Sequence, residues 1–260
     1  MTIYLELTKE FNTGKLRSVL SSGQAAVLHR IAIMSKDGDW ILREDAETMK
    51  HVLAVLSKHD ARYRYGAPLD MRWMSGGWSS HFEFPHQRLR VRTDFVTRPP
   101  RISEAELKIL WKEQEGRELP FVNVRQLAEL KKTNREKDYA VIGELARLMT
   151  EPRDKLLYSR SARDLINLSE THPRLILELA AIRPVLSAIH EGRSRLEEAL
   201  DAERRSLMHA NEERLKTYLK AAEKWAETWT SVAKEIAGLP LAQAHEVVAY
   251  RADAVLPSYP

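Results

Sequence analysis

The sequence contains no cysteine. Disulfides, thiolate nucleophiles and sulfur-ligated zinc are therefore excluded, and any metal site must use carboxylates or histidines. There is also no run of about 18 apolar residues and no signal-like start, because Glu6, Lys9 and Glu10 put charges near the first residue. We expect a cytoplasmic protein with no membrane partner.

Neither sign of charge dominates. The 260 residues carry 41 Lys and Arg against 37 Asp and Glu, a net charge of +4. This mild excess permits a phosphate-bearing partner, but it is too small to indicate a nucleic-acid-binding surface by itself. Hydrophobic residues at 43% can fill a core. Because single cores seldom grow past about 200 residues, the length favours two domains.

Two kinds of pattern follow one another along the chain. Short apolar runs at 16–20, 40–42 and 89–96 and a helical spacing at 46–56 predict mixed strands and helices, which Pro99 and Pro100 close. Helical patterns follow at 104–111, 124–132 and 138–149, with a break at Pro152. We predict an α+β domain over 1–152, with a mixed sheet flanked by helices, and an all-helical domain over 153–260.

The helical half contains a long amphipathic segment, 192–237. As one helix it would span roughly 70 Å at 1.5 Å per residue, so we expect a break near 209–211 or packing against another chain. Trp225 and Trp229, four residues apart on the apolar stripe, predict packing in a core or a partner interface rather than stacking on bases.

Three aspartates carry the chemical signal. Asp37 and Asp39 lead into an apolar strand, and residues two apart in a strand point to one face. In 89–96, Asp94 alternates with Leu89, Val91 and Thr93, so it joins the other two if its strand pairs beside theirs. Carboxylate oxygens are the ligands that magnesium prefers, together with substrate phosphates and water.

Groups that suit phosphate lie near these aspartates. Ser22 and Gly23 precede a predicted helix at 24–29, and a small turn that feeds a helix N-terminus presents free amides to an anion. Arg90 and Arg92 share the face of Asp94 and can contact phosphate. Each feature alone is weak; their order and spacing together favour a nucleotide site.

These residues resemble the DNA polymerase β-type nucleotidyltransferase superfamily, in its minimal and abortive-infection (AbiEii-like) branch. The run SSGQAAVLHRIAIMSKDGDWIL, residues 21–42, is similar to that family's signature, and RVRTDFVTRPPRI to its strand with the third aspartate. The segment FVNVRQLAELKKTNREKDYAVIGELARLM is similar to its closing helices. The resemblance covers residues 15–149.

The resemblance implies transfer of a nucleoside monophosphate from a nucleoside triphosphate (NTP) to a hydroxyl on RNA, protein or a small molecule, with Mg²⁺ or Mn²⁺. It would make Asp37, Asp39 and Asp94 both catalytic residues and metal ligands. It also implies a toxin-antitoxin or defence role. The residues that it implies for nucleotide binding are Ser22, Gly23, Gln24, Ser35, Lys131 and Lys132.

Other readings remain open. A catalytically weak nucleotidyltransferase fold could serve as an interaction or antitoxin-type module. Arg204 with His209, and equally Arg183 with His190, fit the Arg-to-His spacing of helical HEPN ribonucleases. Because the pattern occurs twice it is unspecific, and we expect the helical half to position a substrate or form a homodimer.

Overall fold

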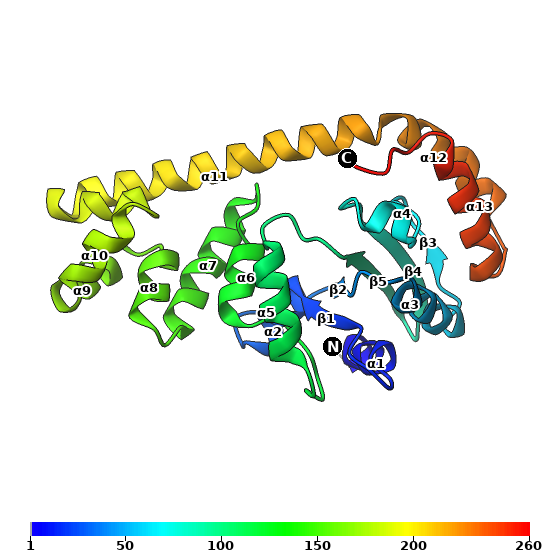
Figure 1. Ribbon diagram of the computed structural model, residues 1–260, viewed down its shortest axis with the longest axis horizontal. Coiled ribbons are helices and arrows are strands. Elements are labelled where there is room, and N and C mark those ends of the chain that lie inside the picture. Colours follow the sequence, from blue (N-terminus) through cyan, green and yellow to red (C-terminus); the bar gives the residue numbers. More distant parts are fainter. Residues whose placement is uncertain (1) are drawn as a thin grey trace. The chain divides into compact units, whose positions relative to one another are not determined.

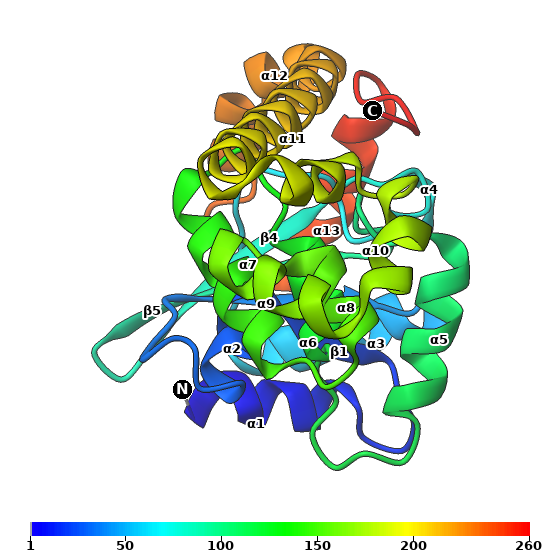
Figure 2. The same cartoon turned by 90° about the vertical axis from the view of Figure 1, so that its left-hand side faces the viewer.

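The computed structural model describes residues 2–260 and divides into two compact units (Figures 1 and 2). Unit 1 consists of Met1–Val122 and Lys216–Pro260, and unit 2 of Asn123–Leu215. The boundary predicted at residue 152 lies inside unit 2, at the first residue of helix α8 (Pro152–Tyr158). The last 45 residues belong to unit 1 because their apolar side chains complete its core.

A five-stranded mixed sheet, in the order β1-β2-β5-β4-β3, forms the centre of unit 1. Its strands are β1 (Ser18–Ser21), β2 (Asp37–Leu42), β3 (Arg62–Tyr63), β4 (Ser80–His86) and β5 (Leu89–Val96). Strands β2 and β5 pair in parallel, and every other pair is antiparallel. The predicted α+β class, with a mixed sheet flanked by helices and a helical C-terminal region, is confirmed.

Seven helices belong to unit 1 in the described residues. They are α1 (Thr2–Phe11), α2 (Ser22–Leu28), α3 (Ala46–Lys58), α4 (Met71–Met74), α5 (Glu104–Gln114), α12 (Glu223–Glu235) and α13 (Leu241–Asp253). Local sequence explains several starts: Asp45 accepts a hydrogen bond from the Thr48 amide at α3, and Ser103 and Glu106 form a capping box at α5.

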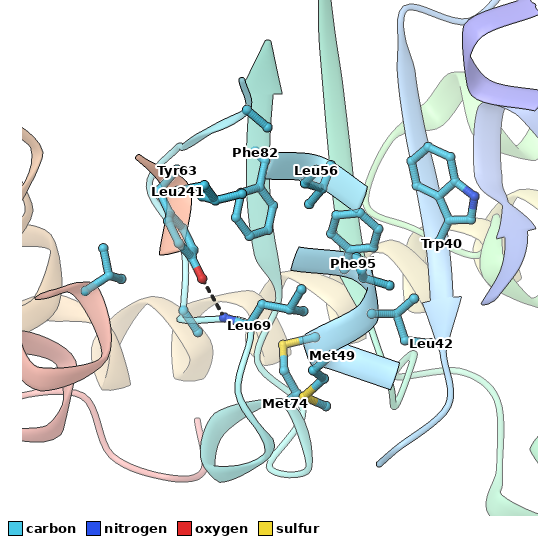
Figure 3. Close-up of a cluster of buried hydrophobic side chains, with 14 of the residues drawn as sticks. Trp40, Leu42, Met49, Leu56, Tyr63, Leu69, Met74, Phe82, Phe95 and Leu241 are labelled. Atoms are coloured by element: carbon cyan, nitrogen blue, oxygen red, sulfur yellow. Dashed lines mark hydrogen bonds between the residues drawn. The ribbon is translucent and has the colours of Figure 1, made fainter. Parts of the chain in front are cut away.

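One face of the sheet carries the large buried side chains (Figure 3). Trp40 and Phe95, on adjacent strands, stack with their ring centroids 5.5 Å apart. Met49, Leu56 and Phe82 belong to the same cluster. This arrangement leaves the opposite face of β2 and β5 available for polar side chains.

Helices α12 and α13 complete that core. Trp225 is 1% exposed and donates a hydrogen bond to the Gly66 carbonyl, and its ring meets Trp229 edge-on. Leu241 and Val248 of α13 are buried in the same cluster. The predicted packing role of Trp225 and Trp229 is therefore confirmed, within the unit that carries the aspartates.

Unit 2 is helical. It contains α6 (Val124–Leu130), α7 (Glu136–Leu148), α8, α9 (Ala162–Thr171), α10 (Pro173–Ala180), the 3₁₀ helix η1 (Pro184–Glu191) and most of α11 (Arg193–Ala221). The break predicted at 209–211 is wrong: α11 runs through these residues and ends at Ala221 (Figure 1). Good helix formers and ion pairs three and four residues apart, such as Arg193 with Glu197, support its exposed length.

Within residues 2–260, no helix combines the length and the apolar character needed to cross a membrane.

Candidate active site

The register of the sheet brings the three aspartates to one face. Asp39 and Asp94 are Cα partners on the parallel strands β2 and β5, and Asp37 pairs with Arg92 two residues earlier on the same strands. Trp40 and Phe95, the next pair, point into the core. Because side chains alternate along a strand, Asp37, Asp39 and Asp94 all lie on the polar face. The prediction that Asp94 shares the face of Asp37 and Asp39 is confirmed.

The phenol of Tyr4 lies close enough to all three carboxylates for their charges to affect its pKa. The pKa of Tyr4 is raised chiefly by burial, and the charges of Asp37, Asp39 and Asp94 each raise it further. The hydroxyl donates a hydrogen bond to the Lys36 carbonyl, next to Asp37. All three carboxylates therefore act on one point at the start of β2.

Asp94 is held by two neighbours on its own face. Its Oδ1 lies 2.7 Å from Nδ1 of His81, its cross-strand partner on β4, and 3.2 Å from a guanidinium nitrogen of Arg64. The other imidazole nitrogen of His81 lies 2.9 Å from Oγ of Ser79. With Nδ1 protonated, His81 donates to Asp94 and accepts from Ser79, so the imidazole fixes the orientation of the carboxylate.

Asp37 is differently placed. Its Oδ1 is buried and makes no hydrogen bond. A guanidinium nitrogen of Arg92 lies 3.9 Å from that atom, but both side chains are more than 40% exposed, so this ion pair contributes little. A buried carboxylate oxygen without a donor is a costly arrangement that a cation would relieve.

The donor set suits a hard cation. Magnesium is usually held by one or two carboxylates, with substrate phosphates and water as the remaining ligands, and Asp37 and Asp39 supply that number. In the described part of the chain, no three His, Asp or Glu side chains form a group that could hold a metal ion as they stand. At this site, Asp94 is turned toward His81 and Arg64.

The turn into α2 packs tightly against the loop before β2. Ser22 adopts a positive φ of 50°, a conformation that side chains other than glycine seldom take. A Cβ built on Gly23 would lie 2.2 Å from Oγ of Ser35, so only glycine fits there. The Gln24 amide donates to the carbonyls of Ser35 and Asp37 and thus anchors the loop that carries the first aspartate.

Lys131 and Lys132 belong to unit 2 and have partners within it. Lys131 is buried and lies 3.3 Å from Asp138, whose carboxylate is almost completely buried. Lys132 pairs with Glu129 at 2.7 Å and lies over the ring of Tyr158. These contacts give both lysines a structural role in the helices around α6 and α7.

Two arginines predicted to meet phosphate also have protein partners: Arg90 pairs with Glu83 on β4, and Arg92 lies near Asp37. Sequence reasoning missed strand β4 and with it His81 and Ser79. The signal was the alternation of buried Ser80, Phe82 and Phe84 with polar residues, ahead of a turn at Gln87.

Comparison with known proteins gives limited similarity. No family model matches the sequence, and no curated protein matches it. A crystal structure of a putative nucleotidyltransferase from Helicobacter pylori aligns with 82% of this chain and 96% of its own at 9% identity, with a TM-score of 0.40. JHP933 from Helicobacter pylori aligns with 85% of this chain and 95% of its own at 10% identity, with a TM-score of 0.39.

Proposed function

We propose that this chain is a metal-dependent nucleotidyltransferase. It moves a nucleoside monophosphate from a nucleoside triphosphate to a hydroxyl of an RNA, a protein or a small molecule. The observation that carries the proposal is the register of Asp39 opposite Asp94 on adjacent parallel strands, with Asp37 on the same face. The sequence resemblance requires three aspartates in this order.

Asp37 and Asp39 would hold Mg²⁺ or Mn²⁺, which neutralises charge on the triphosphate when bound. Asp94, at the same register as Asp39, accepts the proton of the attacking hydroxyl. His81 and Arg64 keep the Asp94 carboxylate in place and act as positioning residues. Positioning and charge neutralisation supply most of the catalysis in phosphoryl chemistry.

The turn into α2 is the proposed triphosphate contact. Ser21 is the Cα partner of Asp39, so Ser22 and Gly23 begin directly beside the aspartates. The close contact of Gly23 with Ser35 holds the start of α2 against the loop before β2. The Gln24 side chain donates a hydrogen bond to the same loop, at the Ser35 carbonyl. Lys131 and Lys132 are retained as nucleotide contacts only on the resemblance.

The test is incubation with each α-labelled triphosphate, Mg²⁺ and a cell extract, followed by a search for a labelled acceptor. We expect one labelled species with the parent protein and none with Asp39→Asn. A parent protein that labels nothing with any triphosphate, in Mg²⁺ or Mn²⁺, would refute the proposal.

One observation favours a second candidate, an interaction or antitoxin-type module. The Asp94 carboxylate already accepts hydrogen bonds from His81 and Arg64, as a structural acid does. In a module, Asp94→Asn would lower the thermal stability and Mn²⁺ would bind no more tightly to the parent than to Asp37→Asn. Calorimetric titration with Mn²⁺ separates the two functions without an acceptor.

The AbiEii-like assignment and a toxin-antitoxin or defence role extend the proposal. Induced expression of an active transferase of this kind should slow bacterial growth, and Asp39→Asn should remove the effect at equal protein level. Equal growth inhibition by both forms would assign the effect to something other than nucleotide transfer.

A further inference from the structure

Unit 2 contains a cavity of about 640 Å³ that the proposed transfer reaction does not use. It is bordered by α7, α9, α11 and the residues that lead into α9. Its basic side chains are Lys137, Arg160, Arg163, Arg193 and Arg204, and its acidic ones are Glu136, Glu197 and Asp201. The volume falls within the roughly 300 to 1,000 Å³ of small-molecule sites.

The acids around the cavity are already neutralised. Glu136 and Asp201 both pair with Arg204, and Glu197 pairs with Arg193 at 2.8 Å. Lys137 and Arg163 are exposed, and neither forms an ion pair with any described residue. The cavity therefore keeps positive charge that no protein carboxylate balances.

Two buried guanidinium nitrogens in the lining lack an acceptor. The Arg160 side chain is 13% exposed and pairs with Glu203 through one terminal nitrogen, while its Nε is buried without a hydrogen-bond partner. Nε of Arg204 is also buried without a hydrogen-bond partner. Burial lowers the pKa of Arg160, and the nearby charge of Arg183 lowers it further. An unmatched buried donor costs free energy and adds to the positive charge beside the cavity.

Three helices begin at the cavity. Its lining includes the first residues of α7, α9 and α11, namely Glu136, Ala162 and Arg193. Unpaired amides and the helix dipole place partial positive charge at each start. At α7 no side chain caps these amides.

We propose that this cavity binds the phosphate groups of a nucleotide-sized ligand. Phosphate matches the exposed Lys137 and Arg163, because its oxygens accept several hydrogen bonds at once and arginine recognises it in a bidentate manner. The phosphate can belong to a free nucleotide or to the 5′ end of an oligonucleotide. The aromatic ring in the lining, Tyr139, is buried under Arg160 and so offers no stacking surface for a base.

The test is calorimetric titration of the full chain with inorganic pyrophosphate and with ATP, in EDTA so that the aspartate site holds no metal. Lys137→Glu/Arg163→Glu should weaken binding at least tenfold. Both side chains are exposed, so the variant should fold. Arg174→Glu/Arg214→Glu, the same charge change at exposed positions of unit 2 outside the cavity, should bind as the parent does.

Two further comparisons identify the molecule that carries the phosphate and the place where it binds. An oligonucleotide that binds only with a 5′ phosphate assigns the site to a strand end, and tighter ATP binding assigns it to a free nucleotide. Loss of binding in Lys137→Glu/Arg163→Glu alone places the phosphate in this cavity, whatever becomes of the proposed transfer activity. The inference is overturned if no phosphate probe binds, if both charge-reversal variants lose binding equally, or if an oligonucleotide binds equally well without its 5′ phosphate.

Discussion

Nδ1 of His81 lies 2.7 Å from Oδ1 of Asp94, across the antiparallel pair of β4 and β5. If His81 positions this carboxylate, His81→Ala should lower kcat roughly tenfold, less than the roughly 10²- to 10⁴-fold that an acid–base group contributes directly, with little change in the KM of the triphosphate. His86→Ala, at the far end of the same strand, is the matched control. A parent-like kcat in His81→Ala would assign the contact to fold stability alone.

Asp39→Asn tests the centre of the site. An amide has nearly the shape of the carboxylate, so the fold should persist while transfer falls by orders of magnitude. Because clustered carboxylates repel one another without a cation, the variant should melt at or above the parent temperature in EDTA. Asp60→Asn, at an exposed turn, is the control. Transfer at the parent rate by Asp39→Asn would refute the assignment.

The pair Lys131 and Asp138 should dominate the local stability of unit 2. Asp138→Asn leaves a buried lysine without its partner, so we expect a loss of about 3 kcal/mol in urea unfolding. Asp154→Asn, a half-exposed aspartate 3.8 Å from Arg125, should cost less than about 1 kcal/mol. Equal losses in the two variants would contradict the structural role of Lys131.

The Lys131–Asp138 pair also predicts that unit 2 loses stability in acid. Burial alone would raise the pKa of Asp138, but hydrogen bonding from Thr133 and the charges of Lys131 and Arg135 bring it below the ordinary 3.8. A depressed carboxylate pKa contributes stability above about pH 4 that is lost as the pH falls through the folded-state pKa. The difference in stability between parent and Asp138→Asn should therefore shrink below pH 4.

His245 predicts a separate pH dependence for unit 1. Burial lowers its pKa below the ordinary 6.5, against the opposing charges of Asp70 and Glu246, and Nδ1 lies 2.7 Å from the Tyr63 hydroxyl. The unfolded chain thus takes up this proton first, so stability is full above pH 6.5 and falls as the pH drops below it. Between pH 8 and 5.5 the melting temperature of His245→Gln should fall less than that of the parent.

Trp225→Ala tests the contribution of α12 to the core of unit 1. Removing this buried ring and its hydrogen bond to Gly66 should cost about 3 to 5 kcal/mol. Tyr250→Ala, whose ring is 78% exposed on α13, should be close to neutral. A small loss for Trp225→Ala would show that α12 adds little to that core.

Local sequence patterns predicted which faces of the strands carry the aspartates. Period-two alternation placed Asp94 opposite the core face of β5, and the apolar run after Asp39 identified β2. Their parallel pairing was not predicted, because alternation gives the faces of a strand but not its neighbours. The two residues that contact Asp94 were not predicted. His81 lies on β4, which was not recognised in the sequence, and Arg64 directly follows the short strand β3.

The partners of the C-terminal helices could not be predicted, because apolar spacing shows that a helix buries a stripe but does not identify what covers it. The stripe of α12 and α13, which contains Trp225 and Val248, is covered by residues 40–95. Similarly, the continuity of α11 through 209–211 depends on favourable residues throughout, and no glycine or proline marks its end at Ala221.

The arrangement of unit 1 on both sides of unit 2 in the chain affects synthesis on the ribosome. Unit 2 is contiguous, so it can fold as soon as residue 215 has left the exit tunnel. The core beneath the aspartate-bearing sheet is complete only with Trp225, Leu241 and Val248, which are translated about 130 to 155 residues after Asp94. Until then the core of unit 1 lacks the side chains of α12 and α13, and part of its apolar surface is open to chaperones.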